Sequence, residues 1–187
     1  MYLNEHVHKK GVMWMAKIIE NLHSTILTVG KRILLEDGYE QMTLRRVAGE
    51  CGIAAGTIYN YFPSKDILVA TIMLEDWQRL LEKAKPELLQ AETAIAGIER
   101  IFDIVREYTC IYQRVWDSYG GSMIISRERH GQLIAQLSGM VDNLLGRFGI
   151  ECVPNPAEFI AEVILQAGIR RDVGFADIAP FISKILL

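Results

Sequence analysis

A short stretch near the N-terminus, Thr43–Lys65 (TLRRVAGECGIAAGTIYNYFPSK), constrains the fold more than any other part of the chain. Apolar residues at helical spacing predict a short helix that begins after Thr43, whose hydroxyl can accept an N–H group of the first turn. Gly52 supplies the left-handed residue at which helices commonly end. A second short helix follows over residues 55–62, and Pro63 stops it. Two short helices joined by a glycine turn predict a helix-turn-helix, whose second helix suits the major groove of DNA.

The same residues resemble a known family signature. The string GTIYNYFPSKDIL, preceded by TLRRVAGECGI, is similar to the DNA-binding signature of the TetR family of bacterial transcriptional repressors, over roughly residues 18–81. The resemblance implies a helical C-terminal part that binds a ligand and forms dimers. One departure concerns Ala54 and Ala55, where family members often carry polar residues. We therefore expect few hydrogen bonds to base edges. Sequence specificity should then depend on contacts with thymine methyl groups and on DNA shape.

We expect DNA contacts from hydroxyl, amide and cationic side chains on the two short helices and just beyond them. Hydroxyl groups can donate to phosphate oxygens, and tyrosine rings can pack against a sugar or a thymine methyl. The alternative is that Tyr59 and Tyr61 only cover the core of the small domain. The candidate contacts are Thr43, Arg45, Arg46, Thr57, Tyr59, Asn60, Tyr61 and Lys65.

The charge of the chain permits double-stranded DNA as a partner without being diagnostic of it. The net charge is −3, but residues 1–66 hold eight Lys and Arg against seven Asp and Glu. Neutralising phosphates requires only a local basic face. The three cysteines lie far apart without a CxxC pair, and the four histidines show no ligand spacing. We therefore expect neither a metal site nor a cofactor.

The sequence also argues against a membrane protein and against an enzyme. No apolar run reaches the ~18–20 residues needed to cross a bilayer, and the N-terminus lacks the apolar core of a signal peptide. A cytoplasmic protein is therefore expected. The sequence contains no GxSxG motif and no phosphate-binding glycine loop. Paired acid–base carboxylates and a Cys–His pair with an orienting partner are not evident either, so we expect no enzyme.

Helical spacing along the rest of the chain predicts an all-α protein in three parts. Residues 1–16 are expected to be a mobile leader. Alternatively, they could result from an upstream translation start, or they could form an arm that reaches DNA. Residues 17–66 are expected to form the three-helix helix-turn-helix domain, whose first helix is predicted over Lys17–Glu36. The resemblance implies that residues 67–187 form a helical effector-binding and dimerisation domain. A continuous helix from Lys65, ended by Pro86, joins the two. Further helices are predicted over residues 91–114, 129–148, 156–171 and 175–187.

The C-terminal half is expected to hold the effector pocket and the dimer contact that the resemblance implies. Aromatic and methionine side chains suit apolar pocket walls with a few polar anchors, although the same residues commonly fill an ordinary core. The pocket candidates are Phe102, Arg106, Cys110, Gln113, Trp116, Tyr119, Met123 and Met140. Apolar stripes on the last two helices predict a two-fold homodimer. The interface candidates are Phe159, Ile160, Val163, Ile164, Ala167, Phe181 and Ile185.

These features together favour a ligand-responsive transcriptional repressor. The expected protein binds a pseudo-palindromic operator as a homodimer and is released by a small, mostly apolar effector. The alternative is a helical ligand-binding or interaction module that does not bind DNA. The two alanines, Ala54 and Ala55, favour that alternative.

Overall fold

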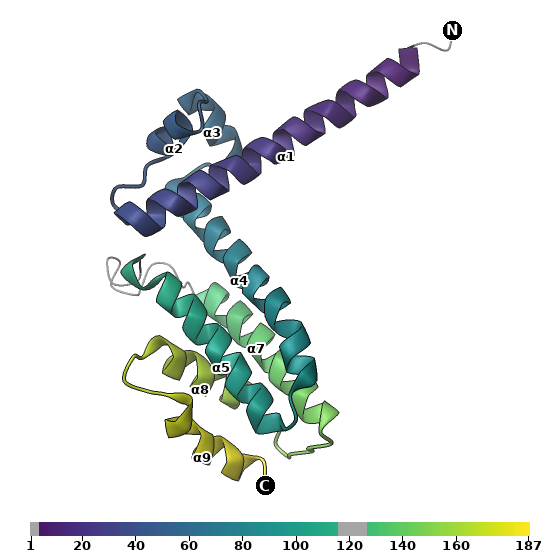
Figure 1. Ribbon diagram of the computed structural model, residues 1–187, viewed down its shortest axis with the longest axis vertical. Helices are drawn as coiled ribbons and strands as arrows, with labels where there is room; N and C mark the ends of the chain where they lie inside the picture. Colours follow the sequence, from purple (N-terminus) through teal and green to yellow (C-terminus); the bar gives the residue numbers. More distant parts are fainter. Residues whose placement is uncertain (1–3, 116–126) are drawn as a thin grey trace. The chain divides into compact units, whose positions relative to one another are not determined.

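The computed structural model describes residues 4–115 and 127–187, with side chains for residues 21–115 and 130–187. These residues form α-helices joined by turns and short loops, which confirms the predicted all-α class (Figure 1). The chain divides into two compact units, Met1–Leu74 and Glu75–Leu187. Helix α4 (Lys65–Gln90) contributes residues to both units.

The N-terminal unit contains α1 (Asn4–Asp37), α2 (Leu44–Glu50), α3 (Ala55–Tyr61) and the first turns of α4. The first helix was predicted to begin at Lys17, but it begins at Asn4. Residues 4–16 contain no proline and one glycine, so their sequence offers no signal that would end a helix there.

Helices α1 and α4 approach each other closely at Gly30. A Cβ atom at this position would lie 3.1 Å from Cδ1 of Ile72 and 3.4 Å from Cδ2 of Leu68. Helix α1 also packs against α2, so it braces the helix-turn-helix from one side. The buried apolar side chains of this unit include Ile26, Ile33, Leu34, Met42, Val47, Ile58, Phe62, Leu68 and Ile72.

The ends of the short helices follow the chemistry that the sequence predicts. Oγ1 of Thr43 accepts the backbone N–H of Arg46 at 3.1 Å, which caps α2. Gly52 has a φ of 69°, the left-handed conformation expected of the turn. Ala54 occupies the N-cap position of α3 and makes no side-chain hydrogen bond there. The start of α3 therefore lacks the cap that α2 has.

We expect Ala54→Ser to raise the free energy of unfolding of the N-terminal unit by about 0.5–2 kcal/mol. The backbone of Ala54 already has extended N-cap geometry, with φ −65° and ψ 143°, and its side chain is exposed. A serine hydroxyl could thus accept an N–H of the first turn without repacking. Chemical denaturation followed by circular dichroism measures the gain. Ala55→Ser, one residue inside the helix, is the matched control, and an equal effect in both variants would contradict the cap assignment.

The C-terminal unit is a helical bundle. Besides the rest of α4 it contains α5 (Ala94–Ile111), α7 (Arg127–Arg147), α8 (Ala157–Ile169) and α9 (Phe175–Ile185). Helix α8 packs against α5 and α7, and α9 packs against α5 and α8 (Figure 1). The packing is close enough that a Cβ atom at Gly168 would lie 2.5 Å from Cγ1 of Val105.

Pro86 does not end α4 as predicted, because the helix continues to Gln90. A proline removes one backbone hydrogen bond of the helix, here in its last turns. Contacts with neighbouring helices attach the residues that follow: Glu87 pairs with Arg100, and the carbonyl oxygen of Leu88 accepts from Arg147 at 2.6 Å. These contacts offset the proline defect.

The start predicted for α5 was also wrong. The helix begins at Ala94 rather than Ala91, because Oγ1 of Thr93 accepts the backbone N–H of Ala96 at 3.1 Å and forms the N-cap. The observed ends of α7, α8 and α9 differ from the predicted ends by at most two residues.

Candidate functional site

Helix α3 buries one face and presents the other to solvent. Ile58 and Phe62 anchor its inner face in the core, with 0% and 2% of their surface exposed. On the outer face, Tyr59 is 49% exposed and Asn60 is also exposed, whereas Thr57 is half-buried. Tyr59 therefore does not serve to cover the core. The outer face offers a hydroxyl, an amide and an aromatic ring to a partner.

Tyr61 and Lys65, both predicted to contact DNA, also make contacts within the unit. Tyr61 is half-buried, and its ring lies 6.4 Å from the ring of His23 on α1. Nζ of Lys65 donates to the carbonyl oxygen of Tyr39 at 3.2 Å and lies 3.6 Å from the centroid of the Tyr39 ring. Both side chains therefore help to hold the C-terminal end of α3 and the start of α4 in place.

The two arginines of α2 differ in their surroundings. Arg45 is exposed, and among the described side chains it makes no ion pair. Arg46 is half-buried and donates to Oδ2 of Asp37 at 2.5 Å and to Oε1 of Glu50 at 3.2 Å. The hydrogen bond with Asp37 raises the pKa of Arg46 above its ordinary value. Arg45 thus offers its charge to a phosphate, whereas two carboxylates offset the charge of Arg46.

The thiol of Cys51, at the end of α2, is not activated as a nucleophile. Burial, and then the charge of Glu50, raise its pKa, so the thiol stays protonated at neutral pH. In the described part of the chain, no three His, Cys, Asp or Glu side chains come together to hold a metal ion. No described helix combines the length and apolar character that a membrane span requires.

A groove of about 650 Å³ lies between α4 and α7 in the C-terminal unit. We call it the α4–α7 groove. Its volume falls in the range of about 300–1,000 Å³ that is typical of small-molecule sites. Among the predicted pocket residues that the structure describes, Met140 alone lines it. The lining residues are Leu81, Lys85, Leu88, Leu89, Ala135, Gln136, Gly139, Met140, Asn143, Leu144 and Arg147.

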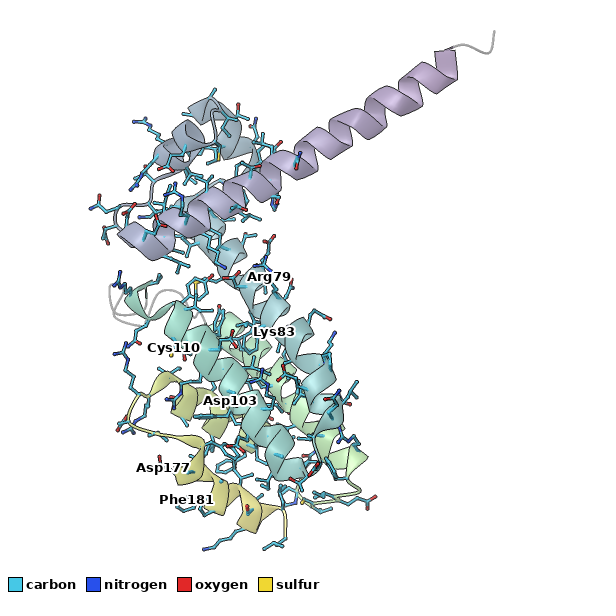
Figure 2. All side chains as sticks on the ribbon, viewed as in Figure 1. Arg79, Lys83, Asp103, Cys110, Asp177 and Phe181 are labelled. Carbon is cyan, nitrogen blue, oxygen red and sulfur yellow. The ribbon has the colours of Figure 1, made fainter. Side chains whose placement is uncertain are left out.

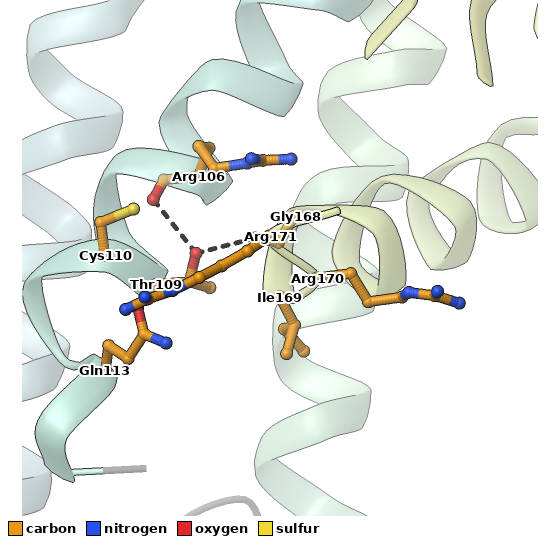
Figure 3. Close-up of a pocket in the computed structure, with 8 residues that line it drawn as sticks. All are labelled: Arg106, Thr109, Cys110, Gln113, Gly168, Ile169, Arg170 and Arg171. Carbon is orange, nitrogen blue, oxygen red and sulfur yellow. Dashed lines mark hydrogen bonds between the residues drawn. The ribbon is translucent and has the colours of Figure 1, made fainter. Parts of the chain in front are cut away.

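A second cleft, of about 90 Å³, lies between α5 and the end of α8 (Figure 3). It brings together three predicted pocket residues, Arg106, Cys110 and Gln113. The side chain of Arg171 extends along this cleft, and its Nε donates to Oε1 of Gln113 at 2.7 Å. The volume is well below the range of about 300–1,000 Å³ for drug-sized ligands. This cleft is therefore a poor candidate for an effector site.

The remaining pocket candidates lie elsewhere. Phe102 is 4% exposed and packs against Phe175, with 5.7 Å between ring centroids, so it belongs to the core. Trp116, Tyr119 and Met123 lie outside the described residues. The structure therefore does not unite the predicted pocket residues in one cavity.

Residues 26–72 match the family model described as bacterial regulatory proteins, tetR family. The matched region spans the helix-turn-helix and the start of α4. Over this region the chain matches the TetR family.

A curated relative matches the N-terminal part of the chain, and solved structures share its fold. The HTH-type transcriptional regulator UidR of Escherichia coli (strain K12) is 27% identical over 82 residues, which cover 44% of this chain and 42% of UidR. The match thus spans less than half the length of that relative. A TetR-family regulator from Pectobacterium atrosepticum has a TM-score of 0.67 at 19% identity, over 91% of this chain and 97% of that one. FadR from Bacillus subtilis, solved in complex with stearoyl-CoA, has a TM-score of 0.53 at 17% identity, over 87% and 96%. These two structures show a shared fold.

The sequence analysis did not identify a buried acid in the C-terminal unit. Asp76 is 5% exposed and accepts the hydroxyl of Tyr112 at 2.6 Å and a guanidinium N–H of Arg79 at 3.1 Å. Burial, and then the hydrogen bond with Asp76, raise the pKa of Tyr112 far above its ordinary value. A signal was present, because Asp76 lies four residues after Ile72 and so falls on the buried face of α4.

The predicted dimer contact divides into core and surface residues. Ile160 and Ile164 are fully buried and Ala167 is 6% exposed, so these three belong to the core of the protomer and cannot meet a second chain. Phe159 and Phe181 are 59% and 68% exposed. Figure 2 shows Phe181 on the outer side of α9. Val163 and Ile185 are half-buried. The outer faces of α8 and α9 thus keep an apolar surface.

Proposed function

We propose that this protein is a TetR-family transcriptional repressor that binds double-stranded DNA through α3. The outer face of α3 carries the proposal, because Tyr59 is 49% exposed on a helix whose opposite face lies in the core. Tyr59 and Asn60 offer hydrogen bonds to phosphates and base edges in a major groove. Arg45, exposed on the preceding helix, adds a positive charge for the phosphate backbone.

The proposed DNA-binding form is a homodimer. The exposed rings of Phe159 and Phe181 supply apolar surface on the last two helices, and isologous contact of such surface with its own copy generates a two-fold axis. Two recognition helices related by that axis match half-sites about 34–36 Å apart, one turn of DNA. A two-fold dimer therefore requires a pseudo-palindromic operator.

The proposed signal is a small, mostly apolar effector that binds the C-terminal unit and releases the DNA. Such release requires that the effector bind the DNA-incompetent state more tightly than the competent one. Helix α4 contributes to both units, so a shift of this helix on effector binding would reach the residues that support α3. The complex of FadR with stearoyl-CoA supports an apolar ligand, because this chain shares the fold of FadR.

Tyr59→Ala should weaken specific DNA binding roughly tenfold, or about 1.4 kcal/mol, because it removes a hydroxyl and a ring from the outer face of α3. Fluorescence anisotropy with labelled DNA from beside the gene, at several salt concentrations, measures the affinity. Val153→Ala is the control, since Val153 is 99% exposed and lies in the C-terminal unit. An unchanged affinity for Tyr59→Ala would remove the assignment of α3 as the recognition helix.

A second candidate function is a helical ligand-binding or interaction module without DNA binding. It is favoured by the uncapped start of α3 at Ala54 and by the internal partners of Arg46 and Lys65. The same titration separates the two candidates. Salt-dependent affinity for DNA supports the repressor, and no affinity at low salt supports the module.

A further inference from the structure

We propose that the α4–α7 groove binds one amphipathic anion, a molecule with an unbranched apolar chain and a single carboxylate head. The inference rests on the proposed effector response and assigns the chemical class of the effector. Three features of the groove carry it: uncovered apolar walls, the sign of its charges, and an open floor at a helix glycine.

The walls of the groove are apolar and incompletely covered. Leu81, Leu88 and Met140 line it, together with Leu89, which is 75% exposed. Leaving large aliphatic side chains in water is unfavourable, and an apolar chain laid along them would remove that surface from solvent. A volume of about 650 Å³ suits one small molecule rather than a protein segment.

The ionisable side chains that line the groove, Lys85 and Arg147, are both cationic. Lys85 pairs with Glu82 on its own helix, and the two side chains are 63% and 69% exposed. Exposed pairs of this kind contribute little, so the ammonium group can turn toward a ligand. Arg147 is held in place instead, because it donates to the carbonyl oxygens of Leu88 and Ala91 at the end of α4. The groove thus offers one movable and one fixed positive charge.

Two hydrogen bonds give the groove a direction. Nε1 of Trp77 donates to Oε1 of Gln136 at 2.7 Å, and Arg147 donates to Leu88 at 2.6 Å. Both bonds join residues 59 positions apart, so α4 and α7 run parallel along the groove. The two cations lie toward the C-terminal ends of both helices, and Gln136 lies toward the other end. A bound anion would place its carboxylate by Lys85 and its chain toward Gln136.

Gly139 keeps the floor of the groove open. It lies inside α7, where glycine is less favourable than alanine, and a Cβ atom there would meet nothing within 4 Å. Packing within the protomer therefore does not explain the missing side chain. Gly139→Leu places a branched side chain into the space assigned to the ligand.

The test is isothermal titration calorimetry of the full chain, without DNA, with three probes of equal chain length below their micelle concentrations. Dodecanoate should bind at least tenfold more tightly than dodecan-1-ol or dodecyltrimethylammonium. Lys85→Met keeps the apolar stem and removes the charge, so it should reduce that preference to less than threefold and leave the affinity for dodecan-1-ol unchanged. Gly139→Leu should abolish binding of dodecanoate, whereas Gly131→Leu should not. Gly131 is also an open position in α7, but it does not line the groove.

Several results would overturn the proposal. Equal affinity for the three probes, or a preference for the ammonium probe, would exclude an anion site. Undiminished binding by Gly139→Leu, or by Ala135→Leu if the first variant does not fold, would place the site outside the groove. Capture by anionic vesicles without binding of monomeric dodecanoate would indicate attachment to a membrane surface instead.

The design keeps this inference separate from the proposed function. Titrations without DNA decide the ligand class, and a DNA titration with and without saturating dodecanoate decides whether the ligand controls DNA binding. If dodecanoate does not bind, the ligand proposal fails, but a measured affinity for DNA still supports the repressor. If the protein has no affinity for DNA, the repressor proposal fails, but measured binding of dodecanoate still supports the ligand class.

Discussion

Phe62→Ala should lower the free energy of unfolding of the N-terminal unit by about 3–5 kcal/mol, the usual cost of truncating a buried phenylalanine. Phe62 ends α3, is 2% exposed and packs its ring 5.1 Å from the ring of His23. Domains of this kind are stable by only about 5–15 kcal/mol, so the loss is a large fraction of the total. Because α3 is held by this ring and by Ile58, DNA binding should be lost together with stability.

Tyr59→Ala is the matched comparison, three residues earlier on the same helix. Its side chain is 49% exposed, so its removal should change the free energy of unfolding by no more than about 0.5 kcal/mol. Guanidinium denaturation followed by circular dichroism measures both variants. We expect one variant to lose stability and the other to lose only DNA affinity. A loss below about 1 kcal/mol for Phe62→Ala would mean that this ring does not anchor α3 in the core.

Tyr112→Phe should lower the free energy of unfolding of the C-terminal unit by about 1.5–3 kcal/mol at neutral pH. The variant removes the hydroxyl that donates to Oδ2 of Asp76 at 2.6 Å and leaves a 5% exposed carboxylate with one donor fewer. Hydrogen bonds to buried charged groups belong to the stronger kind, and the isosteric ring creates no cavity. Urea denaturation at pH 7 measures the difference.

The same pair predicts a pH dependence. Burial raises the pKa of Tyr112 above its ordinary value, so the folded protein keeps this proton where the unfolded chain loses it. The resulting stability is fully present below about pH 10 and falls by about 1.4 kcal/mol per pH unit above it. Tyr112→Phe lacks this loss, so its deficit relative to the parent should shrink between pH 9 and pH 11. A deficit that stays constant across this range would contradict the buried, neutral Tyr112.

The helix-turn-helix could be predicted from the sequence because its signals are local. Thr43 caps α2, Gly52 adopts the left-handed conformation in the turn, and Pro63 follows the end of α3. Each of these residues acts on its neighbours in the chain. The N-terminal start of α1 and the continuation of α4 past Pro86 could not be predicted in this way. Contacts from distant helices, which local sequence signals do not show, support the turns beyond Pro86.

The ligand groove and the dimer surface of the C-terminal unit could not be predicted from the spacing of apolar residues. Helix α8 is apolar on most of its surface, so spacing alone cannot show that Ile160 and Ile164 face their own protomer while Phe159 faces outward. The α4–α7 groove depends on the alignment of two helices far apart in sequence, which hydrogen bonds such as Trp77 to Gln136 fix. Lys85 in isolation resembles any solvated lysine of a surface helix.

Hydroxyl-radical footprinting of the purified protein on DNA from beside its gene, with the stoichiometry measured on the same complex, tests the central claim most directly. The claim is that two copies of α3, presented by paired protomers, bind one operator. We expect two protected stretches on one face of the DNA, about 10–10.5 base pairs apart, with two protomers bound. A single protected stretch with one protomer bound, or no protection at low salt, would contradict the claim.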